Sequence, residues 1–171
     1  MQNINERLSG VCPILPTPFC EDDTIDCGSL EREVNFLLDS GVSGIALFGN
    51  ASEAFALTAA EKQQIAELVV RVNNGRVPLV FGAGGTGIEP AIDSAQWAYK
   101  NGADVLMMMP PYMIKPDAQR IYDYYAAVAK AVPLPIMIQD APGACGVNIP
   151  IDPIVRLVND YDNIRFVKAE A

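Results

Sequence analysis

Short apolar runs alternate with longer helical patterns along this chain. This alternation predicts an α/β protein, a (β/α)8 TIM barrel of which the chain supplies about the first six βα units. The apolar runs are continuous instead of alternating with polar residues, which indicates strands buried on both faces of a parallel sheet. Loops rich in glycine, proline and polar residues follow the runs, and a barrel holds its active site at that end of its strands.

Strands are predicted where mostly apolar residues follow one another between turn residues. These runs cover residues 11–16, 44–48, 78–82, 104–109, 135–139 and 164–168. A barrel typically has eight strands and about 250 residues. The 171 residues therefore predict one barrel domain, 1–171, that is incomplete on its C-terminal side. A six-stranded fold that stands alone is the alternative, and the lack of a GxGxxG turn disfavours a dinucleotide-binding open sheet.

Helices are predicted where apolar residues recur at helical spacing next to capping or stop signals. Thr58 and Glu61 form a capping box that opens one helix, Gly102 closes another, and Pro153 occupies the first turn of a third. The predicted helices cover residues 29–40, 58–72, 89–101, 117–131 and 152–159.

Composition restricts the partners and the location. The net charge of −9 and the pI of about 4.4 argue against nucleic-acid and anionic-membrane partners, which need clustered lysine and arginine. No apolar run approaches the roughly 20 residues of a membrane helix, and the N-terminus has no apolar segment of a signal peptide. We therefore expect a cytoplasmic protein. Four cysteines without CxxC spacing and the absence of histidine predict free thiols and no metal site.

Lys168 ends the last predicted strand, after Phe166 and Val167. A lysine at the C-terminal end of a buried strand points toward the mouth or interior of a barrel, where loss of water lowers its pKa. The free amine can form an imine with a ketone, and the iminium acidifies the neighbouring carbon for aldol cleavage or loss of a β-hydroxyl. The alternative is an ordinary lysine that extends its charge into water.

Three other loops at strand ends carry candidate groups. In the turn after the second predicted strand, the backbone N–H groups with Asn50, Ala51 and Ser52 could bind a carboxylate, although a plain βα turn has the same features. Tyr112 follows two prolines and could relay protons or pack at the rim of a barrel. Gln139 ends the fifth predicted strand and could form hydrogen bonds with a keto acid.

Motifs along nearly the whole chain, in order, resemble the dihydrodipicolinate synthase/N-acetylneuraminate lyase family. They are residues 13–19 (PILPTPF), 49–53 (GNASE), 56–58 (ALT), 75–80 (GRVPLV), 110–112 (PPY), 141–142 (AP) and Lys168. The resemblance implies a barrel of Schiff-base lyases that acts on a pyruvate-like 2-keto acid, needs no cofactor or metal, and usually forms a homotetramer. It assigns the imine-forming lysine of the family to Lys168.

Several positions depart from the synthase pattern. Gln139 stands where synthases and aldolases of the family carry an acid–base tyrosine, and Met113 stands where the synthase has a second tyrosine. Ala144 replaces an arginine that binds the second substrate of the synthase, and the turn reads GNASE where GTTGE is common.

Another branch is resembled by a combination of four segments: Asn50-x-Ser52-Glu53, residues 109–112 (MPPY), residues 136–142 (IMIQDAP) and Lys168-x-Glu170. This combination is similar to the 2-keto-3-deoxy-arabonate dehydratases of sugar-acid breakdown. That branch implies an imine on Lys168 that acidifies C3 while the hydroxyl at C4 leaves, and Tyr112 and Glu170 are candidates to take the C3 proton. The sequence thus favours a dehydratase or aldolase of a 2-keto-3-deoxy sugar acid. The alternatives are the dihydrodipicolinate synthase reaction, in which pyruvate condenses with aspartate semialdehyde, and an inactive barrel that binds a keto acid.

Overall fold

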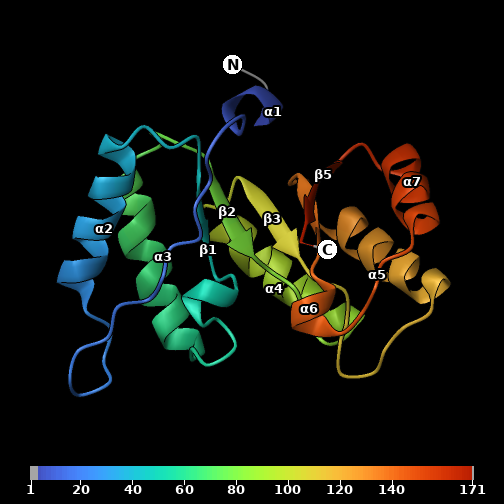
Figure 1. The fold of residues 1–171 in the computed structure, drawn as a ribbon, viewed down its shortest axis with the longest axis horizontal. Helices are drawn as coiled ribbons and strands as arrows, with labels where there is room; N and C mark the ends of the chain where they lie inside the picture. The colour runs from blue at the N-terminus through green and yellow to red at the C-terminus, as the bar shows by residue number, and fades with distance from the viewer. Residues whose placement is uncertain (1–3, 171) are drawn as a thin grey trace. The chain divides into compact units, whose positions relative to one another are not determined.

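A computed structural model describes residues 4–170, which divide into two compact units. Figure 1 labels the elements of each. The first unit comprises residues 4–82 together with Asn101–Ala103, and the second comprises Ala83–Lys100 and residues 104–170. Each unit combines parallel strands with helices, as the sequence predicts.

The first unit is built around two short parallel strands. Its elements are α1 (Ile4–Arg7), α2 (Cys27–Asp39), β1 (Ile45–Leu47), the 3₁₀ helix η1 (Asn50–Ser52), α3 (Ala59–Asn73) and β2 (Leu79–Gly82). Strand β1 pairs with β2 in register from Ile45↔Leu79 to Leu47↔Phe81. All three residues of β1 are buried, which explains why this strand is a continuous apolar run.

Helices α2 and α3 of the first unit begin at side-chain caps. Asp26 accepts a hydrogen bond from the N–H of Ser29 at the start of α2. Thr58 and Glu61 form both hydrogen bonds of the capping box that the sequence predicts for α3. Because a cap satisfies backbone N–H groups that have no partner inside the helix, these local signals fix where each helix begins.

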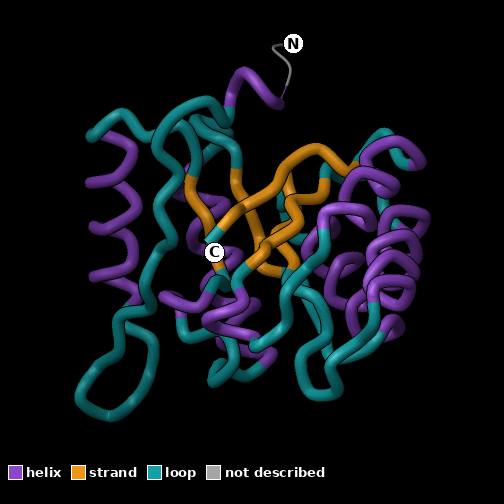
Figure 2. Tube along the Cα trace, turned by 45° about the vertical axis from the view of Figure 1, so that its right-hand side comes forward, coloured by secondary structure: helices purple, strands orange, loops and turns teal. Residues whose placement is uncertain are grey.

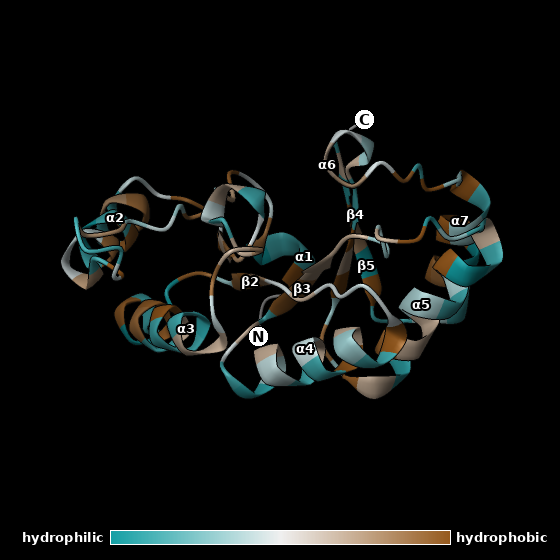
Figure 3. Ribbon diagram, turned by 90° about the horizontal axis from the view of Figure 1, so that it is seen from below, coloured by the Kyte–Doolittle hydropathy of each residue, from teal (hydrophilic) through white to brown (hydrophobic). Residues whose placement is uncertain are grey.

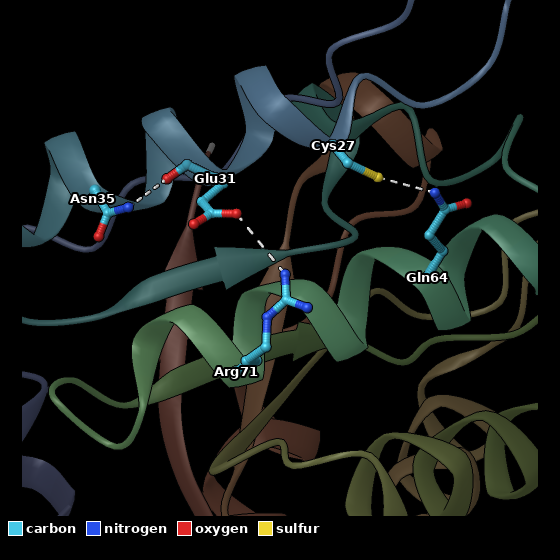
Figure 4. A network of polar contacts seen from close by, with 5 residues as sticks. All are labelled: Cys27, Glu31, Asn35, Gln64 and Arg71. Atoms are coloured by element: carbon cyan, nitrogen blue, oxygen red, sulfur yellow. Dashed lines mark hydrogen bonds and ion pairs between the residues drawn. The ribbon is translucent and has the colours of Figure 1, made fainter.

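Polar contacts join the neighbouring faces of α2 and α3 (Figure 4). Gln64 Nε2 on α3 donates to the Cys27 sulfur at the start of α2 over 3.0 Å, and Arg71 lies 3.9 Å from Glu31. The Arg71 and Glu31 side chains are 70% and 53% exposed, so this ion pair adds little stability. Apolar burial holds α2 and α3 in place instead, through residues such as Leu30, Val34, Ile65, Leu68 and Val69.

The second unit contains three parallel strands that pair in chain order. Its elements are α4 (Ile88–Lys100), β3 (Val105–Met108), α5 (Ala118–Ala131), β4 (Ile136–Asp140), α6 (Pro142–Cys145), α7 (Ile151–Asp160) and β5 (Ile164–Ala169). Strand β3 pairs with β4, and β4 pairs with β5. The strands, orange in Figure 2, are short, and helices and loops make up most of the trace.

One predicted strand is absent as a regular strand. The sequence places a strand at residues 11–16, but this segment makes only an isolated bridge, Ile14↔Ala46. It still runs beside β1, because Leu15 N–H donates to Ala46 O over 2.8 Å and Ala46 N–H donates to Pro13 O over 2.9 Å. Pro13 has no N–H to donate toward β1, so the ladder is interrupted at this residue. The described residues therefore contain five strands where six are predicted.

The five longer helices agree with the prediction to within two residues at each end. Three short helices, α1, η1 and α6, are not predicted, because three or four residues are too few to show a helical period. Helix α3 carries both polar and apolar residues, teal and brown in Figure 3, and it buries its apolar face. Among residues 4–170, no helix combines the length and the apolar character that crossing a membrane requires.

Gly82 at the end of β2 predicts a sharp effect on stability. A Cβ atom at this position would overlap the carbonyl oxygen of Phe48, which is backbone and cannot move aside freely. We expect Gly82→Ala to lower the free energy of unfolding by roughly 3 kcal/mol, at the upper end of overpacking changes. The measurement is the thermal midpoint of the whole protein. Gly143→Ala is the control, because a Cβ there meets no atom within 4 Å, and an unchanged midpoint for Gly82→Ala would contradict the prediction.

Candidate active site

The turn after β1 is held by buried hydrogen bonds within the first unit. The Ser52 hydroxyl donates to the carbonyl oxygen of Leu15 over 2.6 Å, and the Thr17 hydroxyl donates to the carbonyl oxygen of Ser52 over 2.7 Å. Ser52 is 3% exposed and Thr17 is 8% exposed. The Ser52 hydroxyl group thus donates within the protein, to the Leu15 carbonyl oxygen. Its side chain therefore fixes the turn and is not free to donate to a ligand.

Backbone conformation shapes the same turn. Phe48, directly before it, has φ 60°, and Glu53, directly after η1, has φ 54°. Both angles lie in the left-handed region that bulky residues rarely adopt. Phe48 is kept there by an edge-to-face contact with the Phe81 ring at a centroid distance of 5.3 Å and by the close approach of Gly82. Such conformations persist only where the surroundings hold them.

The exposed part of this turn presents backbone donors. Asn50 and Ala51 are exposed, and within the described part of the chain their N–H groups make no hydrogen bond. In η1 the N–H groups of Ser52 and Glu53 donate to Gly49 O and Asn50 O. Of the three residues predicted to bind a carboxylate, Asn50 and Ala51 therefore offer free amide groups, whereas Ser52 is buried.

In the second unit, three polar side chains meet at the ends of β4 and β5. Gln139 and Lys168 are register partners of the two strands. Glu170 forms an ion pair with the Lys168 amine, and the Gln139 side-chain amide donates to the same carboxylate over 3.2 Å. The sequence predicts Gln139 and Lys168 as site residues, and the structure brings them together through Glu170.

Burial differs among these three groups and changes the chemistry of the lysine. Gln139 is 4% exposed, whereas the side chains of Lys168 and Glu170 are each 31% exposed. Partial burial lowers the pKa of the Lys168 amine below the ordinary 10.5 of a lysine. The Glu170 carboxylate acts in the opposite sense, because it stabilises the ammonium form. The net direction is downward, which raises the share of free amine at neutral pH.

Tyr112 is another residue that the sequence predicts for the site. It is 41% exposed and occupies the loop between β3 and α5, next to the exposed side chains of Met113 and Ile114. Nearby in the sequence, the Tyr124 hydroxyl accepts from Gly85 N–H over 3.0 Å and donates to Gly85 O over 3.2 Å. Burial raises the pKa of Tyr124 to about 12, so this phenol stays protonated and holds the loop after β2.

The sequence analysis missed Leu15 and Thr17 as residues that hold the turn. Its only signal for them is the resemblance carried by residues 13–19, because a hydrogen bond across 35 positions leaves no local pattern. All four cysteines are free, as predicted. Residues 4–170 contain no group of three or more His, Cys, Asp or Glu side chains placed to hold a metal ion.

Similarity to known proteins shows to which family the chain belongs. The model of the dihydrodipicolinate synthetase family matches residues 7–171. The chain belongs to this family. A relative from Phocaeicola vulgatus, named 4-hydroxy-tetrahydrodipicolinate synthase, is 33% identical over 165 residues, which cover 96% of this chain and 56% of that protein. A relative of the same name from Chloroherpeton thalassium is 37% identical over 162 residues, covering 95% of this chain and 54% of that protein.

A solved structure agrees with the family and with the fold class. Dihydrodipicolinate synthase from Acinetobacter baumannii, complexed with pyruvate, aligns with a TM-score of 0.90 at 33% identity and covers 94% of this chain and 55% of that chain. This confirms the prediction of a TIM barrel of which the chain supplies a part. The chain spans about half the length of the relatives it matches.

The names of the relatives bear on the predicted branch. Both relatives carry the name of the synthase, which the sequence analysis gives as the alternative, and not the name of a sugar-acid dehydratase. The family is therefore confirmed, and the names favour the alternative over the dehydratase branch.

Ser52 allows a direct test of how the turn is held. Ser52→Ala leaves the buried carbonyl of Leu15 without its donor, and we expect the free energy of unfolding to fall by about 1–3 kcal/mol. Ser40→Ala is the matched control, because it removes a hydroxyl that bonds Phe36 O over 2.7 Å on an exposed helix end. The control should change stability by no more than about 0.5 kcal/mol. Urea denaturation of both variants gives the two values, and equal losses would refute a special role for Ser52.

Proposed function

We propose that the protein is a Schiff-base lyase in which Lys168 forms an imine with the ketone of a pyruvate-like 2-keto acid. The observation that carries the proposal is a half-buried amine, with a lowered pKa, beside Gln139 and Glu170 at the ends of two parallel strands. Because the chain spans about half the length of its relatives, the proposal concerns the whole protein. The relative from Acinetobacter baumannii that is complexed with pyruvate supports the substrate class.

The proposed chemistry needs only an amine and groups that move protons. The free amine of Lys168 attacks the keto carbon, the carbonyl oxygen leaves as water, and a protonated imine remains. The iminium then withdraws electrons from the adjacent carbon, so that a proton on this carbon can be removed. A lysine with its ordinary pKa of 10.5 is almost wholly charged at neutral pH and cannot begin this sequence efficiently.

Binding of the substrate carboxylate is assigned to the turn in the first unit. The free amide groups of Asn50 and Ala51 support this role, since backbone N–H groups in a tight turn bind anions. Ser52 contributes by fixing the turn through its bond to Leu15. The assignment also rests on the family resemblance of residues 49–53.

Two reactions could follow the imine. The names of the relatives favour the synthase reaction, the condensation of pyruvate with aspartate semialdehyde. Gln139 favours the dehydration of a 2-keto-3-deoxy sugar acid, because an amide cannot act as the acid–base group that a tyrosine supplies at this strand end in the synthase. In the dehydratase reaction Glu170, which contacts the lysine, or Tyr112 would take the C3 proton.

Other expectations from the sequence stay predictions. The homotetramer, the cytoplasmic location and the lack of a required cofactor all follow from composition or from the resemblance. An inactive barrel that binds a keto acid without turnover is an outcome that the following experiments can reveal.

Borohydride trapping tests the imine. Incubation of the whole protein with pyruvate and borohydride should add a reduced three-carbon adduct to the peptide that contains Lys168, and Lys168→Ala should abolish it. The rate of trapping should rise with pH and level off below pH 10.5, because partial burial lowers the pKa of this amine. Lys100→Ala, at an exposed helix end, is the control and should trap as wild type does. An adduct that survives Lys168→Ala would disprove the proposal.

Product analysis separates the two reactions. Offered a 2-keto-3-deoxy pentonic acid, a dehydratase releases a 2,5-dioxo acid without free pyruvate, whereas an aldolase releases pyruvate. The synthase consumes pyruvate only when aspartate semialdehyde is present. From Gln139 we expect dehydration to be at least about tenfold faster than condensation, since condensation relies on a proton relay that an amide cannot provide. Faster consumption of aspartate semialdehyde would establish the synthase reaction instead, and trapping without any turnover would establish the inactive barrel.

A further inference from the structure

Strand β5 contains one residue more than β4 over their paired length. The register runs Ile136↔Ile164 and then Met137↔Phe166, so that Arg165 has no partner on β4. From there the pairing is regular, through Ile138↔Val167 and Gln139↔Lys168 to Asp140↔Ala169. Arg165 is therefore an extra residue in β5, and an extra residue in one strand of a pair is a β-bulge.

The bulge determines which face of the sheet carries the lysine. Successive residues of a strand point to opposite faces, and paired residues of neighbouring strands share a face. Ile164 shares the face of Ile136, which is buried beneath the helices. Simple alternation from Ile164 would put Phe166 and Lys168 on this helix-covered face as well. With Arg165 as an extra residue, Lys168 lies instead on the face of Gln139.

The side chains around β4 agree with this assignment of faces. Ile136 and Ile138 are fully buried, and alternation puts Asp140 on their face. One carboxylate oxygen of Asp140 is buried and has no hydrogen-bond partner among the described residues, which agrees with this side chain lying on the buried face of Ile136 and Ile138. Gln139, one residue earlier, points the other way and reaches Glu170.

Contacts on both sides of Arg165 hold the bulge in place. Before it, the Asn163 side-chain amide donates to Ala129 O, Val132 O and Leu134 O over 3.0–3.4 Å. Asn163 O also accepts from Ile136 N–H over 2.7 Å. After it, Glu170 N–H donates to Asp140 O over 2.8 Å and ends the ladder. With both ends anchored, the extra residue is confined to Arg165.

We propose that the bulge absorbs Arg165 as an extra residue, so that Lys168 stays in register with Gln139 and shares its face for imine formation. The proposal rests on the proposed function. The register of Lys168 with Gln139 matters and the side chain of Arg165 does not, because that side chain is exposed and forms no hydrogen bond or ion pair with Lys168 or Gln139 within the described residues. The bulge thus preserves the strand register, and Arg165 itself takes no part in the chemistry.

Deletion of Arg165 tests the proposal in the whole protein by borohydride trapping of pyruvate. Without Arg165 the strand becomes regular, and the pairs Ile136↔Ile164 and Gln139↔Lys168 can both persist. We expect the deletion variant to trap pyruvate at Lys168 within about threefold of the wild-type rate, and Arg165→Ala to match wild type. Insertion of alanine between Val167 and Lys168 shifts the lysine to the face of Asp140, and trapping should fall at least about a hundredfold.

A double substitution leaves the length of the chain unchanged, so it tests the proposal even if the deletion variant does not fold. Val167 shares the face of Ile138 and is 47% exposed, so a lysine fits there without disturbing the core. Val167→Lys combined with Lys168→Ala should give no adduct, because the new amine lies on the face away from Gln139. An adduct on residue 167, or a folded deletion variant that fails to trap, would overturn the proposal. Failure of wild type itself to trap would instead refute the proposed function.

Discussion

The pairing of β5 with β4 is the constraint on which the candidate chemistry depends. It brings Lys168 beside Gln139 and, two residues later on the same face, Glu170. Burial destabilises the charged form of an amine. The partial burial of Lys168 therefore lowers its pKa. The carboxylate of Glu170 limits this effect and keeps the side chain directed along the strand end. The same few contacts thus set the position of the amine and its protonation.

The turn of the first unit reaches a fixed geometry by a different route. Its side-chain hydroxyl groups are used internally, between Ser52 and Leu15 and between Thr17 and the Ser52 carbonyl. The left-handed backbone at Phe48 fits because Gly82, which has no Cβ, lets the Phe48 carbonyl oxygen approach closely. The groups that remain free are main-chain amides, which bind an anion without the loss of side-chain entropy that a flexible ligand-binding residue undergoes.

Local features of this protein could be predicted from the sequence, and features set by distant pairing could not. The capping box of Thr58 and Glu61 and the helices themselves depend on residues a few positions apart, so their signals are visible in the chain. The segment 11–16 has the composition of a strand, yet it makes only one bridge, and Pro13 lacks the N–H that would donate to β1. Lys168 and Gln139 are recognisable because they end apolar runs. Their shared face is not, since the alternation of Ile164, Phe166 and Lys168 gives no sign of the bulge between them.

The relation between family and reaction follows from the same residues. Relatives at 33% and 37% identity share the fold with this chain, while roughly two thirds of the aligned positions differ. In the proposed function, imine formation depends on Lys168 and on the strand that carries it. The step after the imine depends on which group moves a proton, and that group is a single side chain. A phenol can both donate and accept a proton, whereas the Gln139 amide can do neither at neutral pH. In the proposed function, proton transfer near this amine therefore falls to another group, and the Glu170 carboxylate contacts the lysine.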